Sequence, residues 1–402
     1  MTRRRVVVTG VGAWSPLGTT WPTTRAALAR GETAVAPVTS WDATGFPCTV
    51  AAAIDVGTEV EDRRWPLARA AFVEAWAAGG LDAVAPARRG VFLGAESGRA
   101  SFATVRALAR AAGGGATLDP TAFAAAAPAF AARLDASVIS PAAIAARLAS
   151  LADARGPVAT VSLACASGAA AIVDAVRAIR AGACDVAICG GVGADVEPLM
   201  LAGFGLLGAL SARGESCPFD ARRDGFVVGE GAAIVILAAA EVAGAHGGVE
   251  VAGVGRSLDG YRLTAPEPDG DGAFRAMRAA LDDAGAAEID YVQAHGTSTP
   301  LNDPAEMVAL GRALGAAFAR AYVSSVKGAV GHWVAGAGAI GALCAIEAVS
   351  SGLIVPTAGL RVADPSCAAR HVIGAAIHAP VRAALVNAFA FGGANASLVV
   401  RS

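Results

Sequence analysis

A cysteine lies at the junction of a predicted strand and a predicted helix. Cys165 follows the β-branched run 158–162 and precedes the helix-forming run 168–179. A thiol at a helix N-terminus faces the positive end of the helix dipole and free backbone N–H groups, which lower its pKa and favour the reactive thiolate. The same N–H groups are suited to hold an oxyanion. Cys165 is therefore a candidate nucleophile, although by itself a free cysteine is more often an inert buried residue.

Two histidines lie in similar settings in the second half of the chain. His295 opens the segment His-Gly-Thr-Ser-Thr after the predicted strand 291–294, and His332 closes the segment that begins at Lys327. Both would lie at the carboxyl ends of strands, where α/β sheets bind their ligands. Each histidine alone is better interpreted as a structural residue. Together with Cys165 and Lys327 they form a candidate Cys/His/His site.

Strand-like and alanine-rich helical runs alternate along the chain, which indicates α/β layers. Strands are expected at 5–9, 158–162, 185–189, 249–254, 291–294 and 322–325, helices at 168–179, 272–284, 304–314 and 334–350, and a hairpin at 384–400. The same alternation of strands and helices occurs in both halves of the chain. We therefore predict two similar halves, residues 1–243 and 244–402. A helical insertion is expected at about 100–150.

Composition excludes several classes of protein. Of the 402 residues, 55% are hydrophobic and 16% charged, which excludes intrinsic disorder. The net charge of -2 provides no electrostatic footprint for nucleic acid or an anionic membrane. The longest small-apolar run, 122–132, is broken by Pro128 and is too short to span a bilayer. With no cleavable signal pattern after the N-terminal arginines, we expect a soluble, cytoplasmic protein that interacts with neither nucleic acid nor membrane.

The sequence indicates neither a metal site nor a dinucleotide site. Its 7 cysteines are scattered and odd in number, which suits a reducing compartment, and neither CxxC nor HExxH spacing occurs. Gly10 and Gly12 follow an opening strand, but Ser15 stands where a GxGxxG motif needs its third glycine. We therefore expect no metal and no nicotinamide cofactor.

The motifs around these residues resemble a known family. From Arg5 to Val400 the chain is similar to the β-ketoacyl-acyl carrier protein synthases, the decarboxylating condensing enzymes of fatty acid and polyketide assembly. The resemblance rests on six motifs in order, at 6–12, 160–168, 218–231, 295–297, 327–332 and 387–393. It implies the thiolase fold, in which two similar α/β halves form a five-layer αβαβα arrangement. It also implies an acyl carrier protein as partner and a homodimer as the usual assembly, while a heterodimer with a second synthase-like subunit stays open.

The resemblance also implies roles for the candidate residues. Cys165 would accept an acyl chain from acyl carrier protein as a thioester, after which malonyl carrier protein loses carbon dioxide and the carbanion attacks that thioester. His295 and His332 would hold the malonyl thioester oxygen and stabilise the enolate. Lys327 would position and tune the histidine region.

Further residues match family positions that bind and position the substrate. The backbone N–H groups of Cys165 and Phe391 would form the oxyanion hole, and Phe391 with Gly392 would form a mobile gate. Thr297 and Thr299 would hydrogen-bond the phosphopantetheine arm. The substrates bring this arm themselves, so the resemblance implies no resident cofactor.

Some residues depart from the family pattern or compete with the predicted roles. Gly341 stands where the family carries a glutamate of the polar network around the lysine, so we expect Lys327 to lack a partner. Glu230, between two glycines, belongs to a structural loop in the family and lies outside the predicted catalytic set. Asp303 and Glu306 are expected to begin the helix after the first histidine, since acidic residues are favoured in the first turn.

Three alternatives remain to be weighed. A biosynthetic thiolase needs a second cysteine near the C-terminus, but no cysteine follows Cys367. A starter-type synthase pairs its cysteine with a histidine and an asparagine, whereas this chain presents two histidines. A catalytically silent, chain-length-factor-like partner subunit usually loses the cysteine, which this chain retains, but Gly341 keeps that alternative open. The departures also suggest a specialised polyene or type II polyketide enzyme.

Overall fold

The computed structural model describes residues 3–57, 62–79, 81–114, 117–132, 134–244, 248–285 and 288–402. Within these residues, an 11-stranded sheet has the order β12-β10-β9-β14-β15-β8-β1-β7-β6-β4-β5. Its strands are β1 (Val6–Trp14), β4 (Arg89–Gly94), β5 (Val158–Val161), β6 (Val186–Ala194), β7 (Glu230–Ala239), β8 (Val249–Leu258), β9 (Tyr291–Gln293), β10 (Tyr322–Ser324), β12 (Arg370–His371), β14 (Ala383–Phe389) and β15 (Ala394–Arg401). Two short pairs lie apart from this sheet: β2 (Ala36–Pro37) with β3 (Val50–Ala51), and β11 (Leu353–Ile354) with β13 (Ile377–His378).

The sheet consists of one topology used twice. In the first half, β4 pairs in parallel with β5 and β6, and β7 is antiparallel to both β6 and β1. In the second half, β9 pairs in parallel with β10 and β14, and β15 is antiparallel to both β14 and β8. The two halves meet where β1 pairs with β8. The predicted similarity of the two halves is therefore present in the strand order, although the chosen boundary between them stays a prediction.

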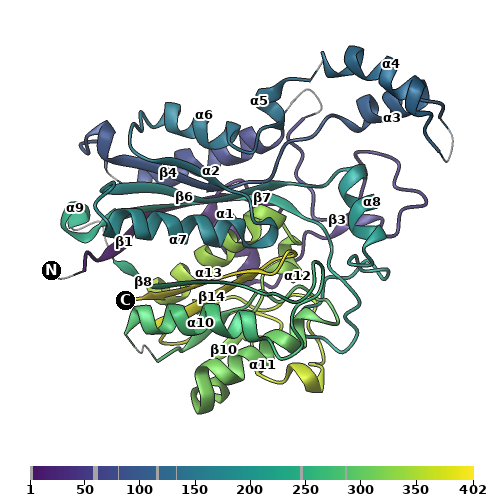
Figure 1. Ribbon diagram of the computed structural model, residues 1–402. Coiled ribbons are helices and arrows are strands. Elements are labelled where there is room, and N and C mark those ends of the chain that lie inside the picture. Colours follow the sequence, from purple (N-terminus) through teal and green to yellow (C-terminus); the bar gives the residue numbers. More distant parts are fainter. Residues whose placement is uncertain are drawn as a thin grey trace.

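Helices cover both halves of the sheet and fill the space between them (Figure 1). The helices are α1 (Trp21–Ala29), α2 (Arg64–Gly79), α3 (Phe102–Ala111), α4 (Pro120–Ala131), α5 (Ala136–Ile139), α6 (Ala143–Leu151), α7 (Ser167–Arg180), α8 (Pro198–Leu206), α9 (Ala240–Ala243), α10 (Asp271–Ala284), α11 (Asn302–Leu314), α12 (Lys327–Val330) and α13 (Ala337–Ser351). The outer layers hold α2 and α6 on one side and α10 and α11 on the other, while α7 and α13 lie between the sheet halves. This is the expected five-layer thiolase arrangement.

The two central helices approach each other closely where they begin. A Cβ on Gly168 of α7 would lie 2.8 Å from the Ala335 carbonyl oxygen, and one on Gly338 of α13 would lie 2.7 Å from the Ala169 nitrogen. Real side chains do not tolerate such distances to backbone atoms. The absence of a side chain at both glycines therefore allows the two helix N-termini to lie side by side.

The expected secondary structure agrees with the observed elements, apart from a few ends. The strand expected at 5–9 continues to Trp14, and the helix expected at 334–350 begins as the short 3-10 turn Val334–Gly336 before α13. The segment Val334–Ser351 is apolar and long enough to cross a membrane, but 89% of it is buried inside the structure, so it is a core helix. Residues 245–247, just after the predicted boundary between residues 243 and 244, lie outside the described residues.

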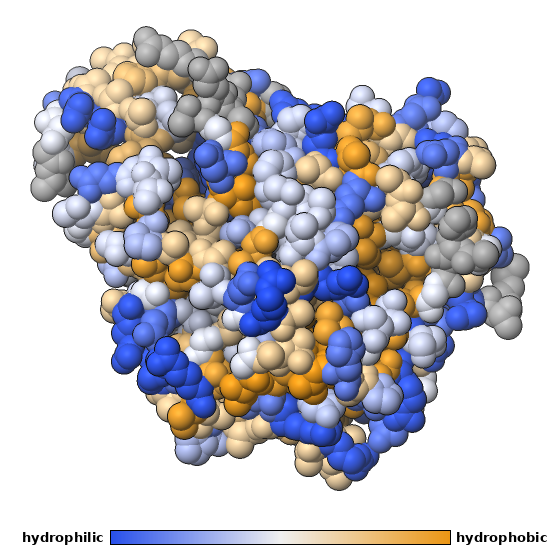
Figure 2. Space-filling view, turned by 180° about the vertical axis from the view of Figure 1, so that it is seen from behind, coloured by the Kyte–Doolittle hydropathy of each residue, from blue (hydrophilic) through white to orange (hydrophobic). Residues whose placement is uncertain are grey.

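Within the expected insertion, α3 and α4 project from the body of the molecule (Figure 1). Figure 2 shows this projection at upper left, with apolar colours over much of its surface. Neither helix buries a residue, although the sequence of α4 contains no charged side chain. The projection therefore exposes apolar side chains to solvent, among them Phe102 and Phe123.

The close helix approach leads to a test of stability. We expect Gly338→Ala to lower the free energy of unfolding by about 1–3 kcal/mol, because the new methyl would overlap the backbone of α7. Gly311→Ala in α11 is the matched control, since a Cβ there meets no atom within 4 Å and alanine favours a helix. Denaturant unfolding of both variants provides the measurement. A Gly338→Ala variant as stable as the parent would contradict the packing account.

Candidate active site

Cys165 lies on a strained turn between β5 and α7. The turn Ala164–Ala166 is a single 3-10 turn, and Ala164 has φ 45°, a conformation that residues with a Cβ rarely adopt. This turn presents Cys165 at the N-terminal end of α7, as the sequence predicts. Its side chain is buried, with 8% of the residue exposed.

His332 lies two residues before a second turn of the same kind, in the other half of the molecule. Val334, in the 3-10 turn before α13, has φ 46°, which is unusual for a β-branched residue. In this conformation the Val334 N–H donates to Nδ1 of His332 at 3.1 Å. Because Nδ1 accepts this bond, the ring proton of neutral His332 resides on Nε2, which is free to donate to a substrate.

His295 is fixed by Lys327 in an analogous way. The Lys327 ammonium bonds the His295 carbonyl oxygen and lies 3.3 Å from Nδ1 of the same histidine. Since an ammonium can only donate, His295 also carries its proton on Nε2. The His295 and His332 rings lie 5.7 Å apart between centroids, nearly perpendicular to each other. The structure thus brings together the four residues of the predicted site, each of them buried.

Two carboxylates expected at the start of a helix lie in the first turns of α11 and also support the loop that begins at His295. Glu306 is buried and accepts the backbone N–H groups of His295 and Gly296, each at 2.8 Å, and the Asn387 amide at 3.0 Å. Asn387 in turn accepts the Ser397 hydroxyl at 2.9 Å. Asp303 lies in the first turn of α11, as expected, and Glu306 follows in the next turn, where it meets the loop that begins at His295. Glu306 holds that loop in place.

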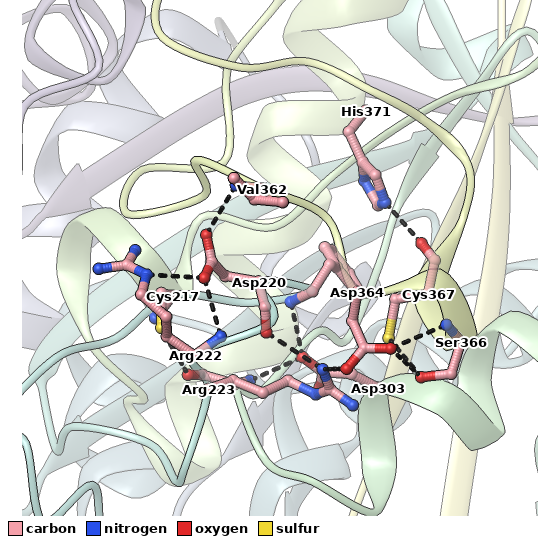
Figure 3. A network of polar contacts seen from close by, with 12 residues as sticks. Cys217, Asp220, Arg222, Arg223, Asp303, Val362, Asp364, Ser366, Cys367 and His371 are labelled. Atoms are coloured by element: carbon pink, nitrogen blue, oxygen red, sulfur yellow. Dashed lines mark hydrogen bonds and ion pairs between the residues drawn. The ribbon is translucent and has the colours of Figure 1, made fainter.

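Asp303 supports the rest of the same loop. It accepts the backbone N–H groups of Thr297 at 2.9 Å, Ser298 at 3.2 Å and Phe219 at 2.8 Å. Figure 3 shows Asp303 beside a polar network in which Arg223 pairs with Asp364 and Asp220 pairs with Arg222. This network joins the loop after residue 217 to the segment 361–367 and supports the histidine loop from below.

Gly341 does not leave Lys327 without partners. A Cβ on Gly341 would lie 3.3 Å from Cγ of Gln293, so the Gln293 side chain occupies the adjacent space. The Gln293 amide oxygen accepts the Tyr291 hydroxyl at 2.6 Å. Lys327 bonds His295 instead, and the negative charge that acts to raise its pKa belongs to Glu306 of α11. The expectation that Lys327 lacks a partner was therefore wrong.

Burial dominates the protonation of the nucleophile. It raises the pKa of the Cys165 thiol to about 12, against the lowering effects of the Lys327 charge and of the Phe391 N–H. The helix N-terminus was expected to lower this pKa below its ordinary value, and that expectation was wrong. Removing the sulfur from water outweighs the nearby positive groups, so the resting enzyme holds a neutral thiol.

Burial also keeps both histidines neutral. It lowers the pKa of His295 and of His332 well below the ordinary value, and the Lys327 charge adds to both effects. Burial lowers the pKa of Lys327 to about 8, while the charge of Glu306 opposes that shift. At neutral pH the site therefore contains two neutral imidazoles, each with a free N–H donor, and one mainly cationic lysine.

The backbone beside Cys165 provides two further donors. The N–H groups of Phe391 and of Cys165 itself lie close enough to the sulfur to act against the rise of its pKa. The Phe391 ring is half-buried at the cavity wall, and Gly392, with φ 84°, donates its N–H to the Leu263 carbonyl at 2.6 Å. Both predicted oxyanion donors thus lie beside the Cys165 sulfur. The residues of the predicted gate lie in the turn between β14 and β15.

A cavity of about 440 Å³ leads from Cys165 and both histidines to the surface. Thr297 and Thr299 line it, with their hydroxyl oxygens 2.8 Å apart. The cavity is also lined by residues that reach the surface, among them the exposed side chains of Leu207 and Leu301. The threonines predicted to bind a pantetheine arm therefore line the same cavity as Cys165 and both histidines.

The Gly229-Glu230-Gly231 segment has a structural place. The Gly229 N–H donates to the His332 carbonyl at 3.0 Å, and His332 donates its own N–H to Val227 at 2.8 Å. The Glu230 carboxylate is buried and accepts hydrogen bonds from the Ile54 N–H and from the Arg63 side chain. The segment holds the backbone of His332, as expected, and its carboxylate faces away from the cavity lining.

Sequence reasoning missed or misread four polar residues that support the site: Glu96, Asp303, Glu306 and Asn387. Three of them act on backbone N–H groups, a role that leaves no spacing pattern in a sequence. The closeness of Asp303 and Glu306 to the His295 motif along the chain is the one signal that could have indicated their role. Among the described residues, no group of three or more His, Cys, Asp or Glu side chains is arranged to hold a metal ion.

The raised thiol pKa predicts the pH dependence of Cys165 alkylation. Below about pH 12 the thiolate fraction, and with it the alkylation rate, should rise roughly tenfold per pH unit. Lys327→Ala should slow alkylation at pH 7, since the lost cation raises the thiol pKa further. The difference should narrow above about pH 8, where Lys327 itself loses its proton. Mass spectrometry of iodoacetamide-treated protein measures both effects, and a rate independent of pH would contradict them.

Comparisons with known proteins agree with this geometry. The profile of the β-ketoacyl synthase N-terminal domain matches residues 58–243, and that of the C-terminal domain matches residues 249–361. The 3-oxoacyl-[acyl-carrier-protein] synthase 2 of Vibrio cholerae is 33% identical over the whole of both chains. The protein of the same name from Synechocystis is 42% identical over 62% of each chain, so the matched part spans less than two thirds of that relative.

Solved structures of ketosynthases have the same fold. One contains a type II polyketide synthase acyl carrier protein in complex with its ketosynthase bound to a hexaketide; it is 28% identical, covers 100% of both chains and has a TM-score of 0.87. Another is the ishigamide ketosynthase/chain length factor, 33% identical over 100% of both chains with a TM-score of 0.85. With its nucleophile turn, paired histidines and full-length likeness to these proteins, the chain belongs to the β-ketoacyl synthase family.

Proposed function

We propose that this chain is a 3-oxoacyl-[acyl-carrier-protein] synthase. It transfers an acyl chain from acyl carrier protein to Cys165 and then condenses that chain with malonyl-acyl carrier protein, releasing carbon dioxide. The observation that carries the proposal is the convergence of the Cys165 sulfur, two backbone N–H donors and two neutral histidines on one cavity. A nucleophile with separate donors for two oxyanions suits a two-step acyl transfer.

In the first step the Cys165 sulfur attacks the acyl thioester. The carbonyl oxygen becomes an oxyanion, which accepts the N–H groups of Cys165 and Phe391. The carbon–sulfur bond to the pantetheine arm breaks, and the proton of the Cys165 thiol ends on the departing pantetheine sulfur. Because the resting thiol is neutral, proton loss accompanies substrate binding and attack.

In the second step the malonyl thioester loses carbon dioxide. The electron pair of the broken carbon–carbon bond passes into an enolate, whose oxygen accepts the Nε2–H groups of His295 and His332. The enolate carbon then attacks the acyl-Cys165 thioester, and the Cys165 sulfur leaves as a thiolate that takes a proton from solvent to restore the resting thiol. Neutral imidazoles suit this role, since each keeps its donor proton while charge develops beside it. Lys327 keeps His295 in the donating tautomer.

The substrates supply the only prosthetic group that this mechanism needs. The phosphopantetheine arm of the carrier protein would lie along the cavity, with Thr297 and Thr299 hydrogen-bonding it. Phe391, on a glycine-flanked turn, would move between the acylation and condensation states. We propose no metal and no other cofactor for the reaction.

A catalytically silent partner subunit is the alternative function. Two solved relatives are ketosynthases with a chain length factor, so such pairing occurs among similar proteins. The intact Cys165, both oriented histidines and the hydrogen-bonded Lys327 favour an active subunit. Specialisation for a polyketide or polyene chain remains our hypothesis for this subunit, and turnover of ordinary saturated acyl carriers at a housekeeping rate would contradict it. A cytoplasmic location agrees with its seven unpaired cysteines.

Acylation of Cys165 tests the proposal directly. Incubation with a short acyl-acyl carrier protein should add one acyl group by intact mass, and Cys165→Ala should abolish the adduct. Malonyl-acyl carrier protein should discharge it. His295→Ala and His332→Ala should retain the adduct while losing about 10²–10³-fold in decarboxylation, because each loses one enolate donor. A folded wild-type protein that forms no adduct with any chain would favour the silent-subunit alternative.

The assembly proposed for this chain is a dimer built on β5. Among the described strands β5 is a sheet edge paired only with β4, and its Val158 side chain is 47% exposed. The Thr160 hydroxyl is buried without a hydrogen-bond partner. An unpaired strand edge is a template for another chain.

Light scattering tests this assembly. The protein should have the mass of two chains, and Val158→Lys should shift it toward one chain, because a charge at the centre of the interface opposes burial. Val362→Lys is the matched control, an equally drastic change of an exposed apolar residue in the other half of the molecule. A dimer unaffected by Val158→Lys would place the interface elsewhere, and a monomeric wild type would contradict the proposal.

A further inference from the structure

Glu96 bonds the turn that carries the nucleophile. It follows β4, and its Oε1 accepts the Ala164 N–H at 2.9 Å. Its Oε2 accepts the Ser162 hydroxyl at 2.8 Å. The Ser167 hydroxyl lies 3.2 Å from Oε1 and also bonds the Ala164 carbonyl at 2.7 Å. One carboxylate therefore contacts the turn both before and after Cys165.

The turn needs external support because its backbone is strained. Ala164 has φ 45°, and strain of this kind persists only where the surrounding contacts hold it. This conformation sets the direction of the Ala164 N–H, which donates a hydrogen bond to Glu96. The bond therefore stabilises the unusual rotation that directs the Cys165 side chain into the cavity.

Glu96 is itself anchored by a buried arginine. The Glu96 carbonyl accepts Arg64 Nη1 at 2.6 Å, and Arg64 is held by two hydrogen bonds to the Asp62 carboxylate at 2.8 and 2.9 Å. Arg64 and Asp62 are both buried. Glu96 is therefore held at its backbone by Arg64, while its two carboxylate oxygens bond the turn.

We propose that Glu96 is a positioning residue for Cys165. It keeps the sulfur at the Phe391 and Cys165 N–H donors, so that the acyl carbonyl is attacked in the oxyanion-hole geometry. The inference rests on the proposed acyl transfer to Cys165. Glu96 touches neither histidine in the structure, so the acylation step depends on it and the decarboxylation step does not.

The experiment measures the two steps separately in three variants. Glu96→Ala should slow acylation of Cys165 by acyl-acyl carrier protein about 10- to 100-fold, since a small misplacement of a reacting atom has effects of this size. Decarboxylation of malonyl-acyl carrier protein should stay within about twofold. Glu96→Gln should restore acylation to within about fivefold, because its amide oxygen still accepts the Ala164 N–H and its amide nitrogen can donate to Ser162.

Glu197→Gln is the matched control. Glu197 lines the same small cavity of about 180 Å³ as Glu96, but its nearest ionic partner is Arg99 at 3.5 Å and no hydrogen bond joins it to the turn. This variant should acylate at the wild-type rate. Thermal unfolding of each variant, followed by circular dichroism, separates misfolding from misplacement, and if Glu96→Ala does not fold, Glu96→Asp, which is one methylene shorter, replaces it.

Several outcomes would overturn the inference. If folded Glu96→Ala or Glu96→Asp is acylated at the wild-type rate, the turn keeps its conformation without Glu96. Equal losses in acylation and decarboxylation would indicate a general structural role, and so would loss of acylation in Glu197→Gln. If the wild-type protein forms no acyl adduct, the proposed function fails first, which the same mass measurement reveals before any variant is compared.

Discussion

The close approach of two helix N-termini is the constraint on which this molecule depends. Helices α7 and α13 begin side by side because Gly168 and Gly338 carry no side chains there. Each helix is preceded by a strained 3-10 turn: the first contains Cys165, and the second begins two residues after His332. Any separation of the helices would move Cys165 away from His332, the donor that we propose for the second step.

Both turns contain the same backbone strain, and each uses it for a different purpose. Ala164 and Val334 have almost equal positive φ angles at equivalent points of the duplicated fold. The strained N–H of Ala164 meets a carboxylate, whereas that of Val334 meets the ring of His332. A single structural device thus orients a sulfur in one half and selects a histidine tautomer in the other.

Burial sets the chemistry of the site as much as its charged groups do. It keeps Cys165 protonated and both histidines neutral, so that Lys327 is the main cation at the centre. The buried carboxylate of Glu306 serves the backbone of the histidine loop instead of a substrate. Such a site binds developing negative charge with neutral donors already in place, which limits reorganisation during the reaction.

The sequence by itself determined the alternation of strands and helices, the two similar halves and the four central residues, because hydrophobic period and local motifs are properties of the chain. It could not indicate that burial would raise the Cys165 pKa, that Glu306 lies beneath His295, or that Gln293 fills the space beside Gly341. Those facts depend on which segments meet across the layers. Desolvation and hydrogen bonds between residues far apart in the chain exist only once the two halves have packed together.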